Sequence, residues 1–157
     1  MSSRQAVLAV FVGFVSLFLF QKAQAAVLNL NPPSGSFSVG STFDVSLFLN
    51  TENESVNVIE VSLSFPPDKL QLVSPSTGQS IVSVWTAPPT FNNQTGRISL
   101  QGGIPGGVNV SSGLFTTLTF RVKGVGQAVL KFLDETKVLL NDGLGTDVLK
   151  QTQGAIY

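Results

Sequence analysis

Histidine and cysteine are both absent from this chain of 157 residues. Their absence removes the commonest general base, the thiolate nucleophile and the usual ligands of zinc. Charged residues make up only 11% of the chain, and none of the nine acidic residues falls in a recognisable catalytic motif. A serine nucleophile would need another base, and no Ser-x-x-Lys sequence stands at the start of a helical pattern. The sequence therefore predicts a protein that is not an enzyme and needs no cofactor.

Long apolar runs are also scarce, and the one that occurs has the surroundings of a secretory signal. Arg4 precedes the run, which covers residues 6–20, and Ala23-Gln24-Ala25 follows it as a cleavage sequence. As a helix, these 15 residues would cover about 22 Å, less than the roughly 30 Å hydrocarbon core of a bilayer. We expect residues 1–25 to be removed as a signal peptide. Residues 26–157 would then form one domain, secreted or held at the cell surface, with no membrane span.

Basic residues do not cluster anywhere in the chain. Removal of residues 1–25 would take away Arg4 and Lys22, which leaves seven basic residues against nine acidic ones and a net charge of about −2. Nucleic acid is therefore not an expected partner, because its binding sites need a basic patch. The chain stops at Tyr157 on a strand-like pattern rather than on a linker. That ending is compatible with further modules or an anchor downstream.

Apolar and polar residues alternate through most of the remaining chain. In Thr42–Asn50, the apolar residues Phe43, Val45 and Leu47 recur at every second position, the period of a half-buried strand. Similar candidates are residues 27–31, 57–65, 70–73, 81–86, 97–101, 114–122, 128–133, 138–140 and 153–157. Turn signals rich in Gly and Pro, such as NPPSG, TAPP, NNQTG and GGIPGG, separate them. Many short strands without helices between them predict an all-β, antiparallel sandwich.

Two rival binding functions rest on few residues. Trp85 is the only tryptophan and Tyr157 the only tyrosine, so an aromatic platform for crystalline polysaccharide is not expected. A site for a single sugar chain around Trp85 stays open, because the pattern does not show which way this side chain points. Calcium needs only carboxylates and carbonyls, and Asp142 and Asp147 in LNDGLGTDVL are weak candidates. The alternative for this segment is a glycine-shaped turn whose Asp side chains bind their own backbone.

Five segments carry a family resemblance: GSFSVGSTFDVSLFL, VIEVSLSFPPDKLQLV, TGRISLQGG, GLFTTLTFRVKGVGQAVLKF and VLLNDGLGTDVL. Together they resemble the cohesin domain of extracellular scaffold proteins. The resemblance covers nearly all of residues 27–157 and implies a flattened jelly roll of nine antiparallel strands in two packed sheets. Related carbohydrate-binding β-sandwiches share some of these features. In cohesins, one sheet face, formed by strands eight, three, six and five, receives a dockerin, a small calcium-loaded module carried by an enzyme.

The resemblance makes residues 57–65 the third strand. Ile59, Val61 and Leu63 would then fill the core, and the alternating polar side chains would face outward on the docking sheet. The candidate partner-binding residues are Glu60, Ser62, Ser64, Ser99, Gln101 and Lys131. The function predicted on this basis is an extracellular protein-docking module. The alternatives are a polysaccharide-binding module from the same structural neighbourhood and, less favoured, a structural or adhesion module of the cell surface.

Overall fold

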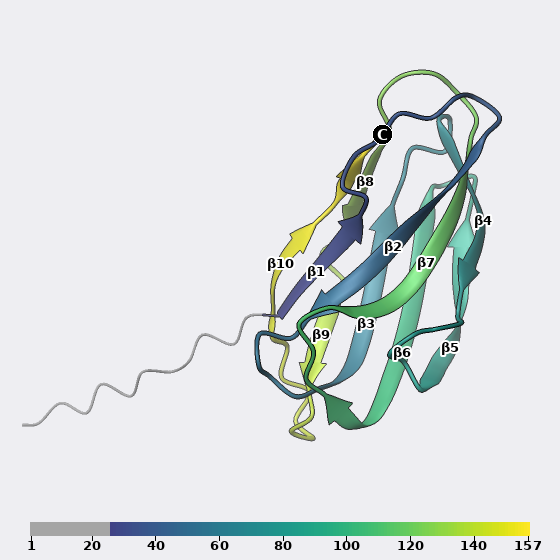
Figure 1. Cartoon of the computed structure of the whole chain (residues 1–157). Helices are drawn as coiled ribbons and strands as arrows, with labels where there is room; N and C mark the ends of the chain where they lie inside the picture. The colour runs from purple at the N-terminus through teal and green to yellow at the C-terminus, as the bar shows by residue number, and fades with distance from the viewer. Residues whose placement is uncertain (1–25) are drawn as a thin grey trace, which may run out of the picture.

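Two β-sheets pack face to face around an apolar core (Figure 1). The computed structural model describes residues 26–157, so the predicted signal peptide lies outside the described residues. Its strands are β1 (Ala26–Asn31), β2 (Thr42–Asn50), β3 (Val56–Ser64), β4 (Leu70–Ser76), β5 (Val84–Asn92), β6 (Arg97–Val108), β7 (Gly113–Val122), β8 (Val129–Phe132), β9 (Lys137–Leu140), β10 (Leu149–Gln153) and β11 (Ala155–Ile156). One sheet has the order β10-β1-β2-β7-β4 and the other β11-β8-β3-β6-β5, and β9 also pairs with β3. Within residues 26–157, no helix is long and apolar enough to cross a membrane.

The alternating pattern becomes the core between the sheets. Phe43, Val45 and Leu47 of β2 are buried, and Val61 and Leu63 of β3 approach them from the opposite sheet. Burial of these side chains is the main favourable contribution to folding. The predicted all-β sandwich is confirmed. Its described part has eleven strands, and one pairing, between β1 and β10, is parallel.

Two segments predicted as turns are parts of strands. The GGIPGG sequence lies inside β6, which continues to Val108. Gly102 is needed there for space, because a Cβ would lie 2.5 Å from a methyl carbon of Val82. The TAPP sequence lies inside β5, an edge strand with two irregularities in its pairing with β6. Proline is tolerated at such an edge, because no further strand needs a hydrogen bond from its missing amide N–H. Proline there also discourages unwanted pairing with other chains.

Tyr157 closes one end of the sandwich. Its hydroxyl donates a hydrogen bond of 2.6 Å to the carbonyl oxygen of Pro32, and its ring packs edge-on against Phe43 with centroids 4.8 Å apart. Burial raises the pKa of Tyr157 to about 12. The neutral hydroxyl is therefore favoured in the folded state.

Titration of this single tyrosine by ultraviolet absorbance should report that burial. We expect a midpoint near pH 12 in the folded domain and near the ordinary value of about 10 after unfolding. Because the folded pKa is the higher one, the stabilising contribution is fully present below about pH 10 and disappears as the pH rises through about 12. A midpoint of about 10 in the folded domain would show that this end of the sandwich is open.

Candidate functional site

The outer face of the six-stranded sheet brings the predicted partner-binding residues together. Glu60, Ser62 and Ser64 alternate with buried Val61 and Leu63 along β3 and are half-buried. The register sets Glu60 opposite Gln101, Ser62 opposite Ser99, and Ser64 opposite Lys131. Side chains of directly opposed residues share a face of the sheet. All six candidates therefore lie on one surface, which we call the outer face.

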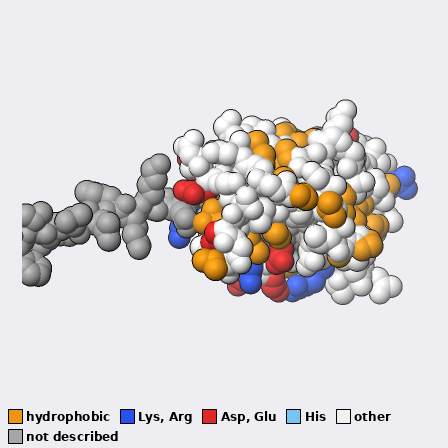
Figure 2. All heavy atoms as spheres, turned by 90° about the horizontal axis from the view of Figure 1, so that it is seen from below, with side chains coloured by type: hydrophobic (Ala, Val, Ile, Leu, Met, Phe, Trp, Pro, Cys, Tyr) orange, Lys and Arg blue, Asp and Glu red, His pale blue; other side chains and the backbone are white. Residues whose placement is uncertain are grey.

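The outer face can be described as four cross-strand rows, named after their β3 residues. The Val58 row is Leu139, Val58, Gly103 and Val84, and the Glu60 row is Lys137, Glu60, Gln101 and Ala87. The Ser62 row is Ser62, Ser99 and Thr90, and the Ser64 row is Lys131, Ser64, Arg97 and Asn92. The face thus changes from apolar at the Val58 row to cationic at the Ser64 row. Figure 2, a view onto one end of the sandwich, shows charged side chains gathered toward one side of the molecule.

A short segment between β8 and β9 lies beside the middle of β3. We call residues 133–136 the flap. The hydroxyl of Thr136 accepts a hydrogen bond from the amide of Ser62 (3.1 Å) and donates one to its carbonyl oxygen (3.0 Å). The amide of Leu133 donates to the same carbonyl oxygen at 2.9 Å. The flap is therefore tied to the backbone of β3 where regular pairing with β8 and β9 is interrupted.

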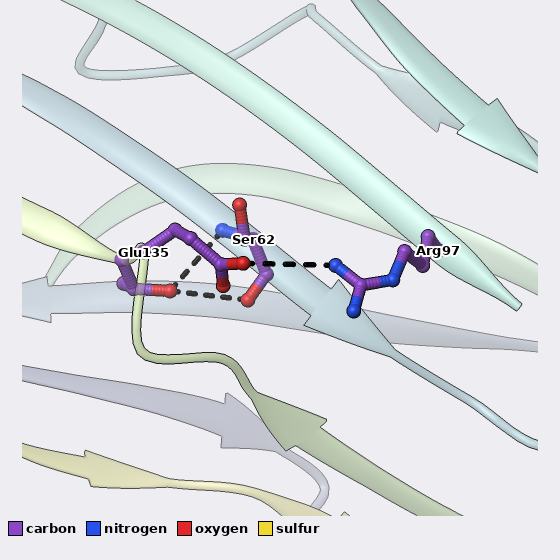
Figure 3. A network of polar contacts seen from close by, with 4 residues as sticks. Ser62, Arg97 and Glu135 are labelled. Atoms are coloured by element: carbon purple, nitrogen blue, oxygen red, sulfur yellow. Dashed lines mark hydrogen bonds and ion pairs between the residues drawn. The ribbon is translucent and has the colours of Figure 1, made fainter.

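The flap also carries a carboxylate across β3. An oxygen of Glu135 lies 3.8 Å from a guanidinium nitrogen of Arg97 on β6, above Ser62 (Figure 3). Beside this ion pair is a hollow of about 210 Å³, lined by Ser62, Ser99 and Thr90 and by Leu133 of the flap, among others. The flap therefore helps to form a hollow at the Ser62 row.

Sequence reasoning missed Arg97, Lys137 and Glu135 as members of this surface. Arg97 was detectable, because it has the same parity as Ser99 and Gln101 in the predicted strand 97–101. Glu135 was not, because it follows a strand end and reaches the face only through the flap.

Trp85 does not belong to the outer face. It pairs in register with Gly102 on the inner side of the sheet, and its ring packs against Phe115 with centroids 5.4 Å apart. It is half-buried and contacts the hydrophobic core. The structure thus gives Trp85 a packing role, and a sugar site around it stays a prediction.

The two weak calcium candidates, Asp142 and Asp147, stabilise local turns through hydrogen bonds. Asp142 accepts hydrogen bonds from the Thr146 hydroxyl and from the amide of Leu144, and these contacts, the first above all, lower the pKa of its carboxyl group. Asp147 accepts from the amides of Val138 (3.2 Å) and Leu149 (3.0 Å). No group of three or more acidic residues gathers into a metal cluster in residues 26–157. The geometry favours the turn interpretation, and calcium binding stays a prediction.

Comparison with known proteins agrees with this architecture. The model of the cohesin domain family matches residues 28–156. No curated protein matches the chain in sequence. Among solved structures, the solution structure of CaCohA2 from Clostridium acetobutylicum has a TM-score of 0.72 at 16% identity, covering 86% of this chain and 90% of that one.

Two further structures share the fold at similar distance. The Coh-OlpC–Doc435 complex, a type I cohesin–dockerin complex from Clostridium thermocellum, gives a TM-score of 0.67 at 14% identity, with 85% of this chain and 90% of that one covered. A non-cellulosomal cohesin from the hyperthermophilic archaeon Archaeoglobus fulgidus gives 0.67 at 17% identity, with 84% and 88% covered. The family model spans most of the described domain, and the sheets agree with these structures. The chain belongs to the cohesin domain family.

Proposed function

We propose that this domain is an extracellular docking module, without catalytic activity of its own, that binds a dockerin-type protein through the outer face. The observation that carries the proposal is the in-register arrangement of Glu60, Ser62 and Ser64 with Ser99 and Gln101 on one sheet of a cohesin domain. Solved complexes of other cohesins with dockerins support the class of partner. Short polar side chains on such a sheet can form hydrogen bonds that set the register of a partner.

Affinity capture tests the class of partner. The immobilised domain, residues 26–157, should retain a protein from the secreted fraction of its own organism when calcium is present, and release it when a chelator is added. The calcium dependence belongs to the partner's loops, so the chelator should leave the melting temperature of this domain unchanged. Retention that is insensitive to the chelator, or a melting temperature that falls with it, would contradict a dockerin-type partner.

The alternative ligand is a carbohydrate, and a separate binding measurement tests it. Affinity electrophoresis in gels containing soluble glucans or xylans should show no retardation of the domain, because Trp85 is packed against Phe115. Retardation that Trp85→Ala abolishes and Glu60→Ala preserves would favour the carbohydrate function. The absence of both protein and glycan ligands would favour a structural role at the cell surface.

The extracellular location rests on the N-terminal sequence. Expression of the full chain in an exporting host should yield a protein whose N-terminus, determined by mass spectrometry, is Ala26. The reason is the cleavage sequence Ala23-Gln24-Ala25 after the apolar run. Recovery of the intact chain from the membrane fraction would show instead that the run acts as an anchor.

A further inference from the structure

The Ser64 row consists of hydrogen-bond donors. Lys131 and Arg97 flank Ser64 on the two neighbouring strands, and both cationic residues are exposed. Asn92 follows Arg97 in the row, and its side-chain oxygen Oδ1 already accepts from the backbone amides of Gln94 and Thr95. Its NH2 group is therefore the part left to face a ligand. No acidic residue is in register in this row.

The one carboxylate that reaches this row comes from the flap. Glu135 pairs with Arg97 at 3.8 Å, and the two side chains are 63% and 61% exposed. An ion pair as exposed as this is weak and exchanges readily. Among residues 26–157, Lys131 forms no ion pair. The row therefore has more positive charge than Glu135 neutralises.

We propose that the Ser64 row binds a carboxylate side chain of the docked protein, and that Glu135 occupies this site until the partner displaces it. The inference rests on the proposed docking function and deepens it by naming a chemical feature of the partner. Guanidinium groups bind carboxylates through two parallel hydrogen bonds. The Ser64 hydroxyl and, beyond it, the Lys131 ammonium lie on one side of Arg97 in the row, and Asn92 lies on the other.

The opposite end of the outer face differs in chemistry from the Ser64 row, and this difference can set the orientation of the partner. Val58 and half-exposed Val84 make the Val58 row apolar. Residues 58 and 64 are six positions apart on β3, which is about 20 Å at the rise of a strand. A matching partner thus presents an Asp or Glu over the Ser64 row and an apolar side chain about 20 Å away. This asymmetry favours one of the two opposite orientations along β3.

The carboxylate site can be tested without a partner, by titrating residues 26–157 with sodium acetate at constant ionic strength. Nuclear magnetic resonance would follow the amide signal of Ser64 and the side-chain NεH signal of Arg97. Acetate should shift both signals, whereas acetamide, its neutral analogue, should not. In Glu135→Gln the apparent dissociation constant for acetate should fall about threefold, the scale of an exposed ion pair.

Two variants control for non-specific effects in this titration. Arg97→Gln should remove the shift at Ser64. Arg121→Gln, which changes an exposed arginine on the outer side of the other sheet, should leave it unchanged. Acetate affinity that is unchanged in Glu135→Gln, or equal shifts with acetamide, would overturn the proposal.

Calorimetry with the protein retained by affinity capture distinguishes this inference from the docking proposal. Glu135→Gln should tighten that complex about threefold and Arg97→Gln should weaken it. If a partner binds but Glu135→Gln weakens the complex, the carboxylate exchange is wrong and docking stands. If acetate binds as expected but no partner is retained, the docking proposal fails together with the assignment of the carboxylate to a partner.

Discussion

Replacing Leu63 by alanine is expected to lower the free energy of unfolding by about 2–5 kcal/mol. Leu63 is 0% exposed and lies opposite Ile98 and Phe132 in the two neighbouring strands. The change removes buried methyl groups and leaves a cavity that the flanking strands cannot fill by collapsing. Urea denaturation followed by the fluorescence of Trp85 measures this loss, provided that the dependence on urea keeps the same slope.

The matched control is the neighbouring residue on the same strand. Ser62 points to the outer face, and it is the backbone of Ser62, rather than its hydroxyl, that bonds to Thr136. Ser62→Ala should therefore change the free energy of unfolding by no more than about 0.5 kcal/mol. Equal losses at positions 62 and 63 would contradict the assignment of the two faces of β3.

The faces of the strands were predictable because one side of each sheet is buried. A shift of register by one residue in β3 would expose Leu63 and bury Glu60, so the two-residue period determines which side chains face out. The bounds Thr42–Asn50 follow from the same pattern and are those of β2. The docking role of the outer face did not follow from the pattern. It came only from the resemblance to cohesins.

The features that the sequence did not predict depend on contacts between distant segments. GGIPGG is a turn by local rules, but Gly102 is glycine because Val82 needs its space, a reason that lies 20 positions away in the chain. The flap was unpredictable for a similar cause. Thr136 replaces regular strand pairing at Ser62, 74 positions earlier. Neither contact leaves a periodic signal in the sequence.

The largest effect on binding is expected from Ser62→Trp. Ser62 lies on the central strand of the outer face and lines the hollow that Leu133 of the flap borders. An indole ring there would push the flap outward and hold a flat partner away from the rows on either side. We expect the complex to weaken at least about thirtyfold, the effect of losing a hot spot of about 2 kcal/mol. Glu60→Ala should also weaken binding, since its loss leaves partner donors unpaired.

The matched control for Ser62→Trp lies on the other sheet. Thr117 is a half-buried residue of β7 that lies opposite Ser46, and its hydroxyl is 3.2 Å from that of Ser46. Thr117→Trp introduces the same bulk on the face that docking does not use. The melting temperatures of both variants should be measured first, so that loss of folding is not mistaken for loss of binding.

The most direct measurement of docking through the outer face is titration calorimetry of the captured protein against the wild-type domain, Ser62→Trp and Thr117→Trp. We expect Ser62→Trp to lose binding while it stays folded, and Thr117→Trp to bind as the wild type does. Wild-type affinity in Ser62→Trp together with loss of binding in Thr117→Trp would place the interface on the other sheet and contradict the account.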